Sequence, residues 1–113
     1  MQDIDGYKAI ACAVVKRAIL DMQTNGTGGS KQAASQTYKD YLKAVVWLAS
    51  KQANIFFDVA GVEQVEVLYA ISWADYAANL LADPKAQDKL TPPERKVLYI
   101  SMDKLGKRFG RHV

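Results

Sequence analysis

Residue types that carry out catalysis are scarce in this chain. Its 113 residues include one histidine, His112, and one cysteine, Cys12. A histidine-based triad and a zinc site of histidine and cysteine ligands both need more of these side chains, which argues against either. Cys12 lies beside the apolar stripe of a predicted helix, where a small buried hydrophobe is its expected role. We therefore expect no enzymatic activity.

Long hydrophobic runs are missing as well, and none reaches the roughly 20 residues of a membrane-spanning helix. The opening residues MQDIDGYK are acidic and polar, whereas a secretion signal is basic and then apolar. A single cysteine cannot form a disulfide within the chain, so nothing indicates an oxidising compartment. We expect a cytoplasmic protein with no membrane partner. At this length, and half hydrophobic, the chain should fold as one domain.

Carboxylates and glycines do occur, but without the spacing that a metal or phosphate site needs. Glu63 and Glu66 share one helix face, yet metal-binding bundles combine such residues with Glu-x-x-His pairs, and the sequence has none. The stretch TNGTGGS (24–30) follows a predicted helix instead of a strand, and it lacks the Gly-Lys-Ser/Thr ending of a phosphate loop. We expect no metal, no cofactor and no small-molecule substrate.

Patterns typical of β-strands are absent, since no segment alternates apolar and polar residues over a useful length. Apolar residues instead recur three and four positions apart, which predicts an all-α protein, a compact bundle of four to five helices. The helices are expected at about 4–23, 32–49, 51–60, 63–82 and 91–105. In the first helix, the stripe that includes Tyr7, Ile10 and Met22 is expected to face inward.

The last helix has the clearest capping signal. The segment TPPE (91–94) sets Thr91 at the N-cap, a proline at the first helical position, and a glutamate that can bond back to the cap. Gly106 is expected to end this helix. The predicted organisation is therefore one helical domain at 1–105, with a flexible loop at 24–30, followed by a basic tail at 106–113.

Other helix ends depend on single residues. Ser50 is a candidate cap for a short third helix that ends at Gly61, where glycine suits the left-handed conformation past a helix end. Whether the chain before and after Ser50 forms one rod or two is open. Asp83 precedes Pro84, and the residue before a proline is disfavoured in helical geometry, so the fourth helix should end there.

The stretch FFDVAGVEQVEVL (56–68) has the outline of a helix-turn-helix with Gly61 at the turn. In that motif the second helix enters the major groove, where Gln64 could read a base edge. Glu63 and Glu66 would then face phosphates and weaken binding, because affinity for DNA comes largely from basic residues. We therefore interpret the stretch as a helix-turn-helix-like glycine corner between packed helices, followed by an acidic face.

Charge is distributed unevenly, although the net charge is only +3. Residues 52–83 contain five acidic and no basic residues, whereas residues 84–113 contain eight basic and three acidic ones. The basic end is the better candidate for nucleic acid, with Phe109 as a ring on which a base could stack. The candidate DNA-binding residues are Arg95, Lys96, Lys104, Lys107, Arg108 and Arg111. Alternatively, the basic end pairs with the acidic middle, within one chain or between subunits.

The stretches AVVKRAILD (13–21) and AVVWLASKQANIFFDVAGVE (44–63) resemble a class of small phage and prophage proteins of uncharacterised role. Those chains share an A-x-x-x-x-A-x-x-D helix, then an aromatic-x-x-S segment, a phenylalanine pair and a G-[IV]-[DE] corner. The likeness covers about half of the chain and includes no catalytic motif. It implies an all-helical fold, a bacterial host, and a regulatory or host-interaction role.

Two function hypotheses follow. The first is macromolecular binding, with DNA contacted through the basic C-terminus in gene regulation. The second is a protein-interaction or assembly module, for example an inhibitor of a host protein, a phage assembly accessory or a homo-oligomer. It would use the acidic face at 58–75 or the aromatic residues Trp47, Phe56, Phe57 and Trp73, although large aromatics usually lie in the core. A third hypothesis, a small hydrolase, is disfavoured by the lack of histidine.

Overall fold

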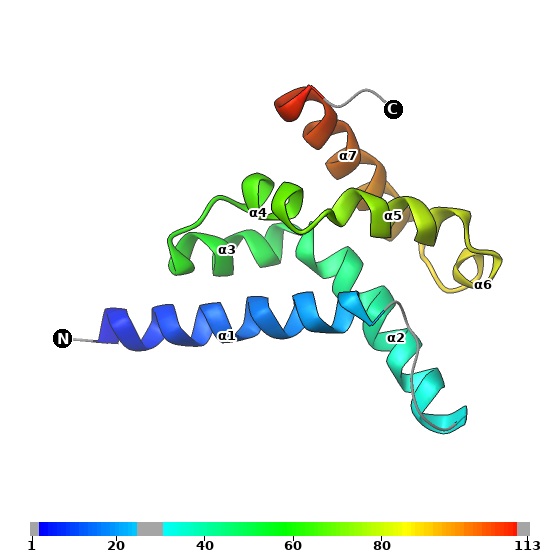
Figure 1. Cartoon of the computed structure of the whole chain (residues 1–113), viewed down its shortest axis with the longest axis horizontal. Helices are drawn as coiled ribbons and strands as arrows, with labels where there is room; N and C mark the ends of the chain where they lie inside the picture. The colour runs from blue at the N-terminus through cyan, green and yellow to red at the C-terminus, as the bar shows by residue number, and fades with distance from the viewer. Residues whose placement is uncertain (1–2, 25–30, 111–113) are drawn as a thin grey trace.

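The computed structural model describes residues 3–24 and 31–110, which form helices joined by short connections (Figure 1). These described residues contain seven helices and no strand, which confirms the all-α prediction. The helices are α1 (Asp3–Gln23), α2 (Lys31–Leu48), α3 (Lys51–Ala60), α4 (Gln64–Ala70), α5 (Trp73–Ala82), α6 (Pro84–Gln87) and α7 (Pro92–Phe109). Apart from Thr24, the predicted flexible loop at 24–30 lies outside the described residues.

The helices form a flattened bundle with principal extents of 48, 38 and 22 Å. Helix α1 runs beside α3 and packs against both α2 and α3, while α5 contacts α2 and α7 (Figure 1). Helix α7 lies on the α4–α5 side of the molecule and also reaches α2. The first and last helices, α1 and α7, therefore both contact α2.

All seven described helices contribute buried residues to one hydrophobic core. Its largest fully buried side chains include Phe57, Trp73, Leu48 and Leu98. The indole Nε1 of Trp73 donates a hydrogen bond to the carbonyl oxygen of Val45 at 2.8 Å, which satisfies the one polar atom of this ring. This bond joins α5 to α2 in the middle of the bundle.

Three predicted helix ends are confirmed by their geometry. Ser50 is the N-cap of α3, and its Oγ accepts a hydrogen bond from the Ala53 N–H at 3.1 Å, so α2 and α3 are separate helices. Gly61 ends α3 with φ 81°, a left-handed conformation that strains other residues. Thr91 and Glu94 form the predicted reciprocal capping box at the start of α7.

The fourth helix is not continuous as predicted, because it breaks after α4 and restarts as α5. Ser72 lies at the break with φ 57°, the one non-glycine residue with positive φ among those described. Leu68 and Trp73 are both buried, although residues five apart on a straight helix point about 140° away from each other. The break allows both side chains to enter the core, which explains why periodicity alone missed it.

Two further helix boundaries differ from the predictions. Asp83 does end α5, but its side chain also accepts a hydrogen bond from the Lys85 N–H and starts the short helix α6, which was not predicted. Helix α7 continues through Gly106 to Phe109 and ends at Gly110, with φ 65°. The first residues of the predicted tail are therefore helical. Residues 111–113 lie outside the described part of the chain.

The N-terminal part of α1 exposes side chains that were expected to face inward. Tyr7 and Ile10 are 64% and 60% exposed, whereas Ala11, Val15 and Met22 are buried. Helices α2 and α3 pack against α1, with Gly61 at the end of α3 beside Lys8, and they leave Tyr7 and Ile10 on an uncovered side of the early turns of α1. Periodicity identified the correct stripe but could not show where the neighbouring helices stop.

Candidate nucleic-acid interface

The six predicted DNA-binding residues do not form one cluster. Arg95 and Lys96 lie in the first turns of α7, whereas Lys104, Lys107 and Arg108 lie in its last turns. Arg108 follows Arg95 by thirteen positions, a distance of about 20 Å along the helix axis. Arg111 lies outside the described residues.

Three of these residues already have partners. Arg108 Nη2 lies 2.8 Å from Glu63 Oε1 and 3.6 Å from Glu66 Oε2, so the basic end does pair with the acidic middle here. Lys107 pairs with Asp103 one turn earlier at 3.1 Å. Arg95 donates to the carbonyl oxygen of Gln87. All the charged side chains in these ion pairs are about half exposed or more, so each pair adds little to stability.

Lys96 and Lys104 form no hydrogen bond or ion pair with another described residue, and both are exposed. At 100° per residue, Lys96, Ile100 and Lys107 fall on the side of α7 opposite buried Leu98. Tyr99 lies at the edge of this side and is 60% exposed. The outer face of α7 therefore combines basic side chains with two exposed apolar ones.

Phe109, predicted as a ring for base stacking, already stacks within the protein. Its ring lies 4.0 Å from that of Tyr69, centroid to centroid, with 14° between the planes. The Arg108 guanidinium lies 5.6 Å from the Phe109 centroid. The stacking on Tyr69 connects the last turn of α7 to α4, which favours a helix that continues past Gly106.

A surface cleft of about 300 Å³ lies between the start of α3, the start of α4 and the end of α7. It is lined by three cations, Lys51, Lys104 and Arg108, against one carboxylate, Glu63. Sequence reasoning missed Lys51 because it lies more than fifty residues before Lys104. The one local signal was Ser50, whose capping role places Lys51 in the first turn of α3.

Gln64, the residue expected to read a base in a helix-turn-helix, has another role. Its Nε2 donates to the carbonyl oxygens of Leu48 at 2.9 Å and Ser50 at 3.0 Å, and so binds the α2–α3 junction. Both amide hydrogens are therefore used inside the protein. Together with the exposed Glu63 and Glu66, this arrangement weighs against α4 as a recognition helix.

The aromatic surface proposed for a protein partner is largely core. Phe57 and Trp73 are fully buried, and the half-buried Trp47 and Phe56 pack on each other at 5.5 Å between ring centroids. The exposed apolar side chains of this region lie elsewhere on α3 and just past its end, at Ile55, Val59 and Val62. The sequence did not predict that these residues are exposed. Helix α3 has apolar residues on both its buried and its exposed side, and such a pattern resembles that of a wholly buried helix.

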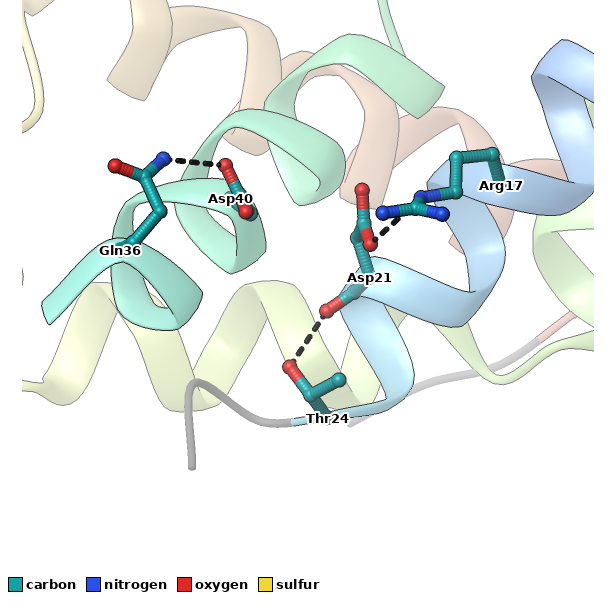
Figure 2. A network of polar contacts seen from close by, with 5 residues as sticks. All are labelled: Arg17, Asp21, Thr24, Gln36 and Asp40. Atoms are coloured by element: carbon teal, nitrogen blue, oxygen red, sulfur yellow. Dashed lines mark hydrogen bonds and ion pairs between the residues drawn. The ribbon is translucent and has the colours of Figure 1, made fainter. Parts of the chain in front are cut away.

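A second surface cleft, of about 280 Å³, lies between α1 and α2. Figure 2 shows three of its charged residues, Arg17 and Asp21 on α1 and Asp40 on the facing α2. Arg17 pairs with Asp21 at 3.3 Å, and Gln36 donates to Asp40 at 2.9 Å. The lining contains two cations and two carboxylates, so this cleft lacks the excess positive charge of the first one.

One polar contact shifts the pKa of both partners. The Tyr38 hydroxyl donates to Asp83 Oδ2 at 2.8 Å, between α2 and the α5–α6 junction. Burial and then this hydrogen bond raise the pKa of Tyr38. The same bond, followed by the Lys85 N–H, lowers the pKa of Asp83. Because Asp83 also caps α6, the shifts are explained by a structural contact.

Comparisons with protein-family models, curated proteins and solved structures gave no match. The resemblance to phage proteins therefore stays a prediction. Among the described residues, no three histidine, cysteine, aspartate or glutamate side chains are placed to hold a metal ion. None of the described helices is long and apolar enough to cross a membrane.

Proposed function

We propose that this protein is a small, non-enzymatic helical protein of phage type that binds duplex DNA in a regulatory role. The observation that carries the proposal is the exposed positive charge of α7, where Lys96 and Lys104 have no partner among the described residues. Lys107, three positions after Lys104, is in a surface ion pair with Asp103 that a phosphate can replace at small cost. Phosphate neutralisation by lysine and arginine provides most of the non-specific affinity for DNA.

Contacts of this type place a protein on the phosphate backbone and carry no sequence information directly. Among the described residues of α7, no asparagine or glutamine is present to form a bidentate pair with adenine. We therefore propose that binding is weakly sequence-dependent and strongly dependent on salt.

Fluorescence anisotropy with a labelled duplex of about 20 base pairs tests this proposal. With three phosphate contacts, affinity should fall about 40-fold between roughly 50 and 200 mM salt. The double variant Lys96→Ala/Lys104→Ala should bind more weakly and with a shallower salt dependence. The matched control is Lys16→Ala/Lys39→Ala, which removes the same charge from exposed positions on α1 and α2.

Two outcomes contradict the proposal. One is the absence of duplex binding by the unaltered protein at low salt. The other is an equal loss of affinity in both double variants, because binding would then follow net charge alone and not the face of α7.

A second candidate function is favoured by the exposed apolar residues of α3. Ile55 is 63% exposed, Val59 follows it four positions later on the same side of α3, and the exposed Val62 lies just past the end of the helix. Such a row suits contact with another protein or with a second copy of the chain. Sedimentation velocity of the unaltered protein and of Ile55→Ser/Val59→Ser tests the second-copy form. A protein that stays monomeric at every concentration tested excludes a homo-oligomer.

A further inference from the structure

The cleft between α3, α4 and α7 contains more positive charge than the surrounding residues neutralise. Lys51, Lys104 and Arg108 line it, and the one carboxylate in the lining is Glu63. Lys51 and Lys104 form no ion pair with any described residue, although both ammonium groups have three donors to share. At about 300 Å³, against about 30 Å³ for a water in the liquid, the cleft can hold a hydrated anion.

Arg108 is only partly used by its two carboxylate partners. Both ion pairs involve the same atom, Nη2, with Glu63 at 2.8 Å and Glu66 at 3.6 Å. A guanidinium has five N–H donors, so the rest of the group can still approach a phosphate. The three side chains are between 47% and 61% exposed, which makes the pairs weak and replaceable.

We infer that this cleft binds a phosphate group through Lys51, Lys104 and Arg108, and that Glu63 and Glu66 compete with the phosphate for Arg108. The inference rests on the proposed function, since it assigns the DNA backbone to a defined place on the protein. It adds Lys51 to the site and gives the acidic corner after Gly61 a role. The carboxylates reduce the affinity for phosphate, so that removing them strengthens binding.

The first test uses the labelled duplex and single substitutions in the full chain. Lys51→Ala should weaken binding by about threefold to tenfold and reduce the salt slope by about one. Lys39→Ala, which removes the same charge from exposed α2, should change neither by a comparable amount. Circular dichroism of each variant verifies that the helices are retained.

The second test uses substitutions that should strengthen duplex binding instead of weakening it. Glu63→Gln/Glu66→Gln should strengthen duplex binding by up to about fivefold, the limit set by a half-exposed ion pair. Asp75→Asn/Asp88→Asn removes the same charge from exposed residues with no ion pair in the described chain, and it should give a smaller gain. The difference between the two double variants isolates the release of Arg108 from the change in net charge.

A third measurement distinguishes a DNA backbone from a free polyphosphate as the source of the phosphate. Sodium tripolyphosphate is titrated into isotope-labelled protein while the amide resonances of Lys51, Asn54 and Gln64 are followed. Suppose that the duplex binds, that Lys51→Ala and Lys39→Ala have the same affinity for it, and that the two double acidic variants also have the same affinity. The cleft is then not the phosphate site, although the proposed function stands. If the duplex does not bind, the proposed function fails. Resonance shifts with tripolyphosphate that Lys51→Ala abolishes would then support the cleft alone, and their absence would overturn it.

Discussion

Helices α3 and α7 each bury one face and expose the other, but the exposed faces differ in chemistry. Helix α3 packs Phe57 inward and exposes Ile55 and Val59, whereas α7 packs Leu98 inward and exposes Lys96 and Lys107. An apolar exposed face suits a protein surface, and a basic one suits a polyanion. The bundle therefore exposes two faces of different chemistry, and the two candidate functions proposed above each use one of them.

The start of α3 and the end of α7 line the same surface cleft. There Lys51 of α3 lies with Lys104 and Arg108 of α7 in one cleft, and Glu63 closes it from the α3–α4 connection. The basic character of α7 thus extends onto α3 only at this point. Along the rest of α3 the exposed residues are uncharged or acidic, namely Gln52, Asn54, Ile55, Asp58 and Val59.

The largest effects on stability are expected from substitutions of the buried residues of α3 and α7. Phe57→Ala and Leu98→Ala should destabilise the fold by about 3–5 and 2–5 kcal/mol, because each leaves a cavity in the shared core. Their exposed neighbours, Ile55→Ala and Ile100→Ala, should change the free energy of unfolding by no more than about 0.5 kcal/mol. Urea denaturation measures all four. A large loss for either exposed variant would show that its face is covered in solution.

A glycine that ends α3 and a glycine within the last turns of α7 are expected to give a smaller difference in stability. Gly61→Ala should destabilise by about 1–2 kcal/mol, because φ 81° strains alanine. Gly106 lies inside α7 and has no positive φ, so Gly106→Ala should stabilise by about 0.5–1 kcal/mol. Thermal unfolding of both variants measures the difference. Equal destabilisation would contradict the continuous course of α7 through Gly106.

The N-caps of the two helices allow a still finer comparison. Ser50→Ala removes the acceptor for the Ala53 N–H at the start of α3, and Thr91→Ala removes one half of the capping box of α7. Each should cost about 1 kcal/mol. Ser50→Ala should also weaken duplex binding, because Ser50 positions Lys51, whereas Thr91→Ala should not. Equal duplex affinity of the two variants would show that the N-cap of α3 does not affect phosphate binding in the cleft.

Local signals made several of these features predictable from the sequence. The cap at Ser50, the turn at Gly61 and the box at Thr91 each depend on residues within a few positions of one another. The break at Ser72 and the exposure of Tyr7 depend instead on which helices pack nearby, and periodicity does not contain that information.

The candidate site divides in the same way. The basic residues of α7 could be read from the sequence, because charge runs are visible in composition. The sequence predicted a pairing of the basic end with the acidic middle only as an alternative and did not identify Arg108 with Glu63. It missed Lys51, because long-range packing brings these residues together. The sequence showed only that Gln64 could read a base edge within a helix-turn-helix, and it could not predict the bonds of Gln64 to the α2–α3 junction.

The smallest expected effect concerns the hydrogen bond between Tyr38 of α2 and Asp83, which lies at the α5–α6 junction. Tyr38→Phe removes the hydroxyl that donates to Asp83, so the pKa of Asp83 should rise toward its ordinary value. Part of the lowering should remain, because the Lys85 N–H still bonds the carboxylate. Carboxyl NMR titration of both proteins measures the shift.

The direction of the pH dependence follows from that lowered pKa. A depressed carboxyl pKa adds stability above the ordinary value of about 3.9, and this stability is lost as the pH falls through the folded-state pKa. The stability difference between the unaltered protein and Tyr38→Phe should therefore be larger at neutral pH than at about pH 2–3. A difference that stays constant over this range would mean that Tyr38 acts through packing and not through the charge of Asp83.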